Sequence, residues 1–454
     1  MAISTIKYDE HGNPKRAKYC LVALGNHEQS DWSKDDTFAP VLSMLQIRLL
    51  TMLAIKHCRR LKSCDIKQAF VEALLPHNER YIVQPPHGIT NFKNSYMLLK
   101  KLLYGLRRAP RHFFDKLRDC LVNKLGLKQC PNAPCIFYGT LIPGQPPIYI
   151  GTYVDDLIFF SASDKVELQF QQLLDAHFTV DWQGQVTHYL GIRFQWTDLP
   201  ENNLQVHMSQ EAYIDQLLQT HNLIDDAINT KQTPYCSGYP VDAIPTTSST
   251  TKENLHLQSK LRSIVGSMNW LSLATRPDIM TITNMLAQYQ HKATYGHIEA
   301  AKYALKYLKG TKQLGICFSS QHNQAMESYV KFPILPDKIT ALCDANWGPQ
   351  DQSTVPQHSI PAELETFKSQ SISGFLIYLL GPLDWCSRRQ RLTAHSSCES
   401  EIYATDECIK QLTHIRHILD DLEITDLCIT NPIPVYNDNS ACVNWSKHTT
   451  SRSI

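Results

Sequence analysis

The sequence lacks any apolar run that approaches the roughly 18 residues needed to cross a bilayer. It also lacks a basic head followed by an apolar signal segment, since Met1 is followed by polar sequence. These two absences argue against a membrane-spanning or secreted protein. We therefore predict a soluble intracellular protein with no membrane partner and no targeting signal.

Cysteine is present but never clustered. The 14 Cys are scattered singly, with no CxxC pair and no Cys/His group at the spacing of a zinc site. Disulfides would then require chance proximity, and the better interpretation is reduced thiols in a cytosolic or nuclear setting. A disulfide-stabilised extracellular scaffold and a zinc-finger module are both disfavoured.

Charge is nearly balanced overall but unevenly distributed. The formal net charge is +1, yet residues 1–130 hold 22 Lys and Arg against 11 Asp and Glu, while the remainder holds 22 against 32. A basic N-terminal third is the expected footprint of a phosphate backbone. The alternative is a solvated basic face that serves solubility. At 454 residues the chain exceeds one typical core, so two to four domains are expected.

The stretch Ile148 to Phe160, IYIGTYVDDLIFF, sets two adjacent carboxylates between two β-rich apolar runs. The pattern predicts a buried hairpin with Asp155 and Asp156 at or near its tip. Two neighbouring anions in a core repel one another and must be desolvated, so a cation should meet them there. A divalent metal suits them, because hard Mg²⁺ prefers carboxylate oxygens. The alternative is a type I′ turn whose Asp residues face water.

The motif from Tyr153 to Asp156 resembles the catalytic hairpin of reverse transcriptases, and its surroundings resemble the copia-type retrotransposon polyprotein. TFAPV from Thr37 to Val41 matches that family, as do ATRPDI from Ala274 to Ile279 and YLKGT from Tyr307 to Thr311. The resemblance covers nearly the whole chain. It implies an α+β fold: a right-hand polymerase with fingers, ferredoxin-like palm and thumb, then a helical connection and a truncated ribonuclease H-like α/β domain.

The same resemblance implies the domain boundaries. The stretch after Pro234 is also rich in Pro, Ser and Thr, which favours a linker. We expect partial fingers at 1–62, a palm with fingers segments at 63–200, a thumb at 201–235, the linker at 236–255, a connection at 256–330 and the C-terminally truncated ribonuclease H-like domain at 331–454.

LKSCDIKQAF from Leu61 to Phe70 aligns with the family segment that carries the first metal-binding carboxylate, which implies this role for Asp65. A two-metal polymerase site needs a third carboxylate from a separate strand. We expect a β-α-β-β-α-β palm, with its last strand at Tyr189 to Phe194, that brings Asp65 beside Asp155 and Asp156.

The family also implies binding residues around this hairpin. Phe70 would lie against the sugar of the incoming nucleotide and disfavour a 2′-OH, the alternative being an ordinary core Phe. Tyr104, Arg107 and Arg108 lie in LYGLRRAPR and would contact template or nucleotide phosphates, or else begin a solvated helix. Tyr189–Ile192, with Leu190 and Gly191 at its centre, resembles the hairpin that supports the primer terminus.

The last block carries a second set of acids. Asp344 ends a strand-like run, Glu399 lies in the first turn of a helix that Ser396 opens, and Asp438 follows the strand-like Val435 to Asn437. Matches to the family's CDADW, SSTEAE and DNQSA imply a ribonuclease H site, for which we expect Glu399 rather than Glu401. A Glu in a first helical turn can also merely complement the helix dipole.

The chain departs from the family pattern in several places. Met1 starts inside the fingers region, Cys20 and Leu24 replace two basic residues, and residues 350–369 form an unusual insertion. Each lost phosphate contact would remove about 1.5–3 kcal/mol from nucleotide binding. Ser451–Ile454 stop before the last strand, final helix and fourth acid of the family's ribonuclease H domain, so an incomplete site is expected. Protease, integrase and zinc-knuckle signatures are missing.

The prediction that follows is an RNA-directed DNA polymerase of a copia-type retrotransposon that uses Mg²⁺, with Mn²⁺ as the alternative ion. Its metal ligands would be Asp65, Asp155 and Asp156, and in the ribonuclease H region Asp344, Glu399 and Asp438. Its partners would be an RNA template, a DNA primer, an RNA–DNA hybrid, dNTPs and other segments of the same polyprotein, in a cytoplasmic virus-like particle or the nucleus. The alternatives are a decayed, inactive nucleic-acid-binding fragment and a host protein that uses a captured palm as a scaffold.

Overall fold

The computed structural model describes most of the chain, and its contacts divide into two compact units. Unit 1 comprises Met1–Gln46 and Leu61–Gln185, and unit 2 comprises Ile47–Arg60 and Val186–Ile454. The residues described are 1–8, 14–28, 32–73, 75, 79–85, 95–225, 227, 229–235, 241, 244, 246, 251–321, 338–347, 370–424 and 432–447.

Unit 1 is built on a six-stranded antiparallel sheet with the strand order β10-β3-β9-β8-β7-β6. The four strands β10-β3-β9-β8 stand in the order that a β-α-β-β-α-β unit produces when its first and last strands pair. The central strands are buried on both faces because their side chains are almost wholly apolar. The strands are β3 (Lys62–Ile66), β6 (Lys128–Gln129), β7 (Ile136–Gly139), β8 (Ile148–Tyr153), β9 (Asp156–Ser161) and β10 (Val180–Gln185).

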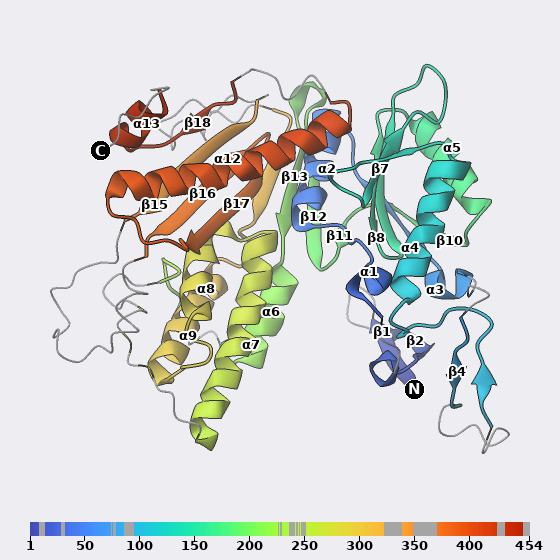
Figure 1. The fold of residues 1–454 in the computed structure, drawn as a ribbon, viewed down its shortest axis with the longest axis horizontal. Helices are drawn as coiled ribbons and strands as arrows, with labels where there is room; N and C mark the ends of the chain where they lie inside the picture. The colour runs from blue at the N-terminus through green and yellow to red at the C-terminus, as the bar shows by residue number, and fades with distance from the viewer. Residues whose placement is uncertain are drawn as a thin grey trace. The chain divides into compact units, whose positions relative to one another are not determined.

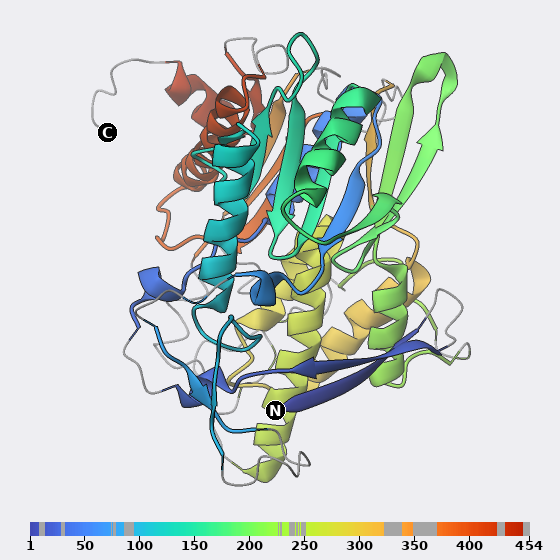
Figure 2. The same ribbon diagram turned by 90° about the vertical axis from the view of Figure 1, so that its right-hand side faces the viewer.

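Two helices cover one face of this sheet, as Figures 1 and 2 both show. They are α4 (Ala109–Asp119), which continues as a π-helical turn over Cys120–Lys124, and α5 (Asp164–Asp175). The chain leaves the first of them at Gly126, whose φ of +74° suits a glycine stop. The sequence predicts this amphipathic helix and its glycine stop, and the structure confirms both. The apolar residues that recur at helical spacing are Phe113, Phe114, Leu117, Cys120, Leu121 and Leu125.

The last strand of this unit is not where the sequence analysis placed it. Strand β10, Val180–Gln185, pairs with β3, whereas Tyr189 and Ile192 belong to a different sheet in unit 2. The prediction of Tyr189–Phe194 as the final palm strand is therefore wrong. Four of the six residues of β10 are exposed, so it carries no apolar alternation by which a strand could be recognised.

The N-terminal part of unit 1 contains two small antiparallel ribbons. One pairs β1 (Ala2–Tyr8) with β2 (Pro14–Leu21). The turn residues Asp9–Asn13 between strand-like runs predict such a hairpin. The paired strands confirm it, and the turn itself lies outside the described residues. The other pairs β4 (Ile82–Val83) with β5 (Met97–Leu98). Three short helical elements complete this part: η1 (Gly25–His27), α1 (Lys34–Thr37) and α3 (Ala69–Glu72).

Unit 2 contains a four-stranded antiparallel sheet, a helical bundle and a second four-stranded sheet. The first sheet has the order β11-β12-β13-β14. The connection is helical, as the sequence predicts, and the helices of the bundle bury a continuous apolar core. The elements are β11 (His188–Tyr189), β12 (Ile192–Asp198), η4 (Pro200–Asn202), β13 (Leu204–Ser209), α6 (Glu211–Thr220), α7 (Lys252–Ala274), η6 (Pro277–Ile279), α8 (Met280–Ala287), α9 (Tyr295–Gly310) and β14 (Ile316–Ser319).

Helix α2 (Met44–Lys56) begins in unit 1, but from Ile47 onward it belongs to unit 2. Every residue from Ile47 to Ile55 is buried, as expected of a helix that is enclosed on all sides. Apolar residues at helical spacing over Leu42–Lys56 predict this helix, and the structure confirms it.

The second sheet of unit 2 has the order β17-β16-β15-β18, in which β15 and β18 are parallel and the other neighbours antiparallel. Helix α12 lies across this sheet (Figure 1) and packs on β15 and β16. The elements are β15 (Thr340–Asn346), β16 (Ile372–Tyr378), β17 (Pro382–Arg389), α12 (Ser397–Asp421), β18 (Val435–Tyr436) and α13 (Ser440–Ser446).

The predicted linker at 236–255 is only partly described. Val241 and Ile244 are buried in the helical core, and Lys252–Leu255 already belong to the mostly exposed first turn of α7. The insertion at 350–369 and the terminal Ser451–Ile454 lie outside the described residues. Among the described helices, none combines the length and apolarity that crossing a bilayer requires.

Candidate active sites

The hairpin of β8 and β9 places Asp155 and Asp156 at a two-residue turn. Tyr153 pairs with Asp156 across the hairpin, so Val154 and Asp155 form the turn. Val154 has a φ of +57°, the sign that a type II′ turn needs at its first central position. A β-branched residue there costs about 1–3 kcal/mol, which is the kind of strain that concentrates at functional sites.

Asp65 is brought to this turn by strand pairing. Asp65 in β3 lies directly opposite Asp156 in β9, and the Ile66 amide donates a 2.9 Å hydrogen bond to the Asp155 carbonyl oxygen. All three Asp side chains are half-buried. Side chains of directly paired residues share one face of a sheet, so Asp65 and Asp156 lie on the same face. The three carboxylates offer only oxygen donors, the set that Mg²⁺ and Mn²⁺ prefer.

Phe70 lies near this strand and is held by other rings. Its ring centroid is 4.6 Å from that of Tyr104 and 6.0 Å from that of Phe113, both in edge-to-face geometry. Phe70 is only 8% exposed. The ring is thus fixed in place, which suits either a rigid wall or a core side chain.

The two arginines expected at the nucleotide have protein partners. Arg107 donates a 2.8 Å hydrogen bond to the Gly25 carbonyl oxygen. Arg108 forms an ion pair with the buried Glu79 and stacks on Trp32 at 4.5 Å from the ring centroid. Phosphate binding by either side chain would therefore require an exchange of partners.

Leu190 and Gly191 form the turn between β11 and β12. Their φ values are +48° and +76°, which is the pair of positive values of a type I′ hairpin turn. The predicted hairpin is present, and it belongs to unit 2.

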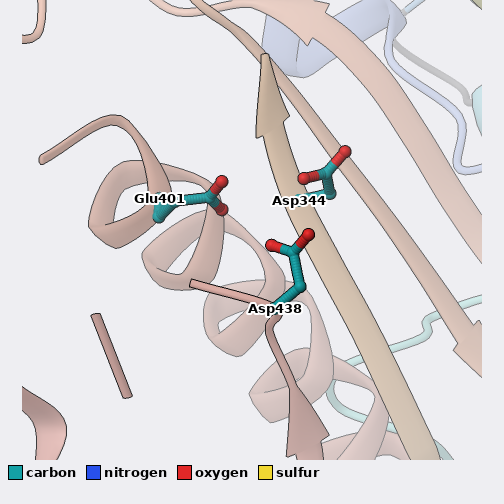
Figure 3. A group of neighbouring side chains, drawn as sticks. All are labelled: Asp344, Glu401 and Asp438. Atoms are coloured by element: carbon teal, nitrogen blue, oxygen red, sulfur yellow. The ribbon is translucent and has the colours of Figure 1, made fainter. Parts of the chain in front are cut away.

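A second group of acids lies in unit 2. One carboxylate oxygen each of Asp344, Glu401 and Asp438 lies within 4.8 Å of the others, and Figure 3 shows the three carboxylates turned toward one another. Asp344 is near the C-terminal end of β15, and Asp438 follows the parallel strand β18. The parallel pairing brings these two strand ends to one edge of the sheet, where α12 supplies Glu401. This all-oxygen set also fits a hard divalent ion.

The structure selects Glu401 rather than Glu399 for this group. Glu399 is directed elsewhere: its carboxylate accepts hydrogen bonds from the His395 amide at 2.7 Å and the Tyr403 hydroxyl at 2.7 Å, which lower its pKa. Two residues on a helix are about 200° apart, so both glutamates cannot face the sheet. Glu401 is in phase with the buried Ala404 and Cys408 of α12, a periodicity that sequence reasoning could have used.

Burial raises the pKa of Glu401, and the neighbouring Asp344 and Asp438 carboxylates add to this effect. Hydrogen bonds from the Asn437 side chain and the Ala345 amide oppose it. Three acids so close together repel one another, and a bound cation would relieve that repulsion. The mutual repulsion of the three carboxylates and their all-oxygen donor set thus both favour a bound divalent cation.

Comparison with known proteins identifies the larger context of these two acidic sites. Residues 3–237 match the family described as reverse transcriptase (RNA-dependent DNA polymerase), which is more than half of the chain. The chain belongs to the reverse transcriptase family. Within the matched segment lie Asp65 and the hairpin acids, whereas the group around Glu401 lies beyond it.

The relatives place the chain among copia-type retrotransposon polyproteins. It is 28% identical to the retrovirus-related Pol polyproteins from transposons RE1 and RE2 of Arabidopsis thaliana, in each case over 100% of this chain and 28% of the relative. It is 23% identical to that from transposon TNT 1-94 of Nicotiana tabacum, over 97% of this chain and 30% of the relative. The chain therefore spans less than a third of the length of these polyproteins.

Proposed function

We propose that this chain acts as an RNA-directed DNA polymerase, with Asp65, Asp155 and Asp156 as its metal-holding carboxylates. The observation that carries the proposal is the register of β3 against β9, which puts Asp65 opposite Asp156 at the hairpin tip. When bound, a pair of Mg²⁺ ions would activate the primer 3′-hydroxyl and stabilise charge on the transferring phosphoryl group. Mn²⁺ is the alternative ion.

The remaining residues of the region would position the substrates. The Phe70 ring, fixed by Tyr104, would form the wall against the nucleotide sugar, and Arg107 and Arg108 would contact phosphates after exchanging their present partners. The turn at Leu190 and Gly191 would support the primer terminus. We retain fingers, palm and thumb as proposed subdomains, with the end of the palm sheet at Gln185 and α2 outside the fingers core.

The test is primer extension on an RNA template with Mg²⁺ and dNTPs. Asp65→Asn, Asp155→Asn and Asp156→Asn should each reduce extension roughly 10²–10³-fold, the range typical of removing one group that stabilises transition-state charge. Asp119→Asn, an exposed carboxylate on α4, is the matched control and should extend like the wild type.

The rival is an inactive fragment that only binds nucleic acid. A folded wild-type chain that binds an RNA–DNA hybrid but does not extend a primer would refute the polymerase proposal and favour that rival. The loss of an Asp155 carboxylate should leave hybrid binding by such a fragment nearly intact.

A second function is favoured by the acids Asp344, Glu401 and Asp438. Each of these carboxylates places one oxygen within 4.8 Å of the others, two of them near the ends of the parallel strands β15 and β18 and one on α12. This arrangement suits the hydrolysis of a phosphodiester, here in the RNA strand of an RNA–DNA hybrid. The side chains would hold a divalent ion and orient the scissile phosphate.

Cleavage of labelled RNA in a hybrid tests this second function. Glu401→Gln should abolish cleavage, whereas Glu399→Gln, two residues away on the same helix, should leave it near the wild-type rate. The reverse pattern would restore Glu399 as the metal-holding residue. Primer extension by both variants serves as the folding control.

A further inference from the structure

Asn437 adjoins the group of acids Asp344, Glu401 and Asp438 without being one of them. It follows β18 and directly precedes Asp438. Its side-chain amide nitrogen donates a 2.9 Å hydrogen bond to Oε2 of Glu401. The same nitrogen lies 3.3 Å from the Thr405 hydroxyl and 3.6 Å from the Cys343 sulfur, so it contacts both α12 and β15.

The other end of the Asn437 amide fixes the loop that carries Asp438. Its side-chain oxygen accepts a 2.8 Å hydrogen bond from the Asn439 amide, which closes an Asx turn around Asp438. Asn439 in turn caps α13 by accepting a 2.9 Å hydrogen bond from the Cys442 amide. One planar amide therefore links the helix, the strand and the loop from which the three carboxylates project.

We infer that Asn437 is the positioning residue of this site: it orients Glu401 through its amide nitrogen and Asp438 through its amide oxygen. The inference rests on the proposed hybrid-cleaving function. An amide suits this task because it donates and accepts at fixed geometry without adding a fourth charge beside three carboxylates. Removal of a group that orients metal-holding side chains typically lowers metal affinity or activity 10–100-fold.

The test measures metal binding as well as cleavage. Mn²⁺ binding is followed by electron paramagnetic resonance in the full chain carrying Asp155→Asn and Asp156→Asn, so that the hairpin acids do not contribute. In this background, Asn437→Ala should raise the Mn²⁺ dissociation constant roughly 10-fold. With the hairpin acids intact, it should raise the Mg²⁺ concentration for half-maximal hybrid cleavage by a similar factor and leave primer extension unchanged.

Asn437→Leu separates positioning from space filling, because leucine has the same branching and number of side-chain heavy atoms as asparagine but no donor or acceptor. It should bind Mn²⁺ as weakly as Asn437→Ala, and it provides a second variant should the alanine protein fail to fold. Asn444→Ala, an exposed asparagine on α13, should behave like the wild type.

Two results would overturn the inference. Wild-type Mn²⁺ affinity in Asn437→Ala, or its restoration in Asn437→Leu, would show that the amide does not position the carboxylates. The proposed cleavage site itself could also fail. This would be the result if the chain with Asn437 intact does not cleave a hybrid and if Asp344→Asn does not weaken its Mn²⁺ binding. The role of Asn437 would then fail with the site.

Discussion

Arg48 of α2 should be among the most sensitive positions for the stability of unit 2. It is 4% exposed, and its guanidinium stacks on Trp385 with its central carbon 4.1 Å from the ring centroid. It donates hydrogen bonds of 2.7 Å to the Leu383 and Leu273 carbonyl oxygens. A 2.8 Å ion pair with Asp384 completes its partners. Burial lowers the pKa of Arg48 to about 10, so it remains charged at neutral pH.

Arg48→Met keeps the unbranched apolar stem of the side chain and removes the charged guanidinium. The change leaves Asp384, whose side chain is 15% exposed, without its cation, and it removes the hydrogen bonds that Arg48 donates to the Leu383 and Leu273 carbonyl oxygens. Removing one partner of a buried ion pair lowers the free energy of unfolding by about 3–5 kcal/mol. Urea unfolding followed by circular dichroism should show this loss of stability at pH 7.5.

The loss should also depend on pH. Burial already raises the pKa of Asp384, and Arg48 opposes that rise, so the pKa climbs further in Arg48→Met. A carboxyl group whose pKa is higher in the folded state than in the unfolded state stabilises the folded protein at low pH. This stabilisation is lost as the pH rises from the unfolded-state pKa of about 4 through the folded-state pKa. Arg48→Met should therefore recover part of its stability at pH 5.

Asp384→Asn in the same chain should remove this pH dependence, because no buried charge is left to titrate. A loss below 1 kcal/mol in Arg48→Met, or a loss that is the same at pH 5 and pH 7.5, would refute the reasoning. Such a result would mean that Asp384 reaches solvent once Arg48 is gone.

Three further predictions concern single positions. Gly105→Ala should destabilise the chain by about 1–3 kcal/mol in urea unfolding, because Gly105 has a φ of +91° and an added Cβ would lie 2.1 Å from the Ala23 carbonyl oxygen; an unchanged midpoint would contradict this. Ser396→Ala should cost about 1 kcal/mol by the same measurement, since the Ser396 hydroxyl oxygen caps α12 by accepting from the Glu399 amide at 3.1 Å. Phe70→Val should raise ribonucleotide incorporation about 10-fold in primer extension if the ring is the sugar wall; unchanged discrimination would leave Phe70 a core residue.

The elements that the sequence predicted correctly are those whose information is local. The hairpin around Asp155 and Asp156 was found because its strands are apolar on both sides of a two-residue turn, and the structure confirms it. The glycine end after α4 and the cap of α12 at Ser396 were found for the same reason. Each depends on neighbours within a few residues, which a single sequence displays directly.

What the sequence did not reveal depends on distant partners. Strand β10 is mostly exposed and is a strand only because it pairs with β3, more than a hundred residues earlier. The apolar α2 could be predicted as buried, but not in which unit, because its partners Leu273 and Asp384 are far along the chain. Asn437 showed no signal at all, since an asparagine before an aspartate is common and only the fold gives it Glu401 as a partner.

The two acidic sites are assembled by different physical means, and this should make them differ in tolerance. At the hairpin, the register of β3 against β9 places Asp65 opposite Asp156. A slip of one residue would turn every buried side chain of β9 to the opposite face of the sheet, so the register is strongly enforced. In unit 2, Glu401 is selected by the rotation of α12 and oriented through the single amide of Asn437. Register is enforced by a whole strand, whereas this orientation rests on a few hydrogen bonds. Substitutions of residues next to the acids should therefore reduce the proposed cleavage activity more than comparable substitutions reduce the proposed polymerase activity.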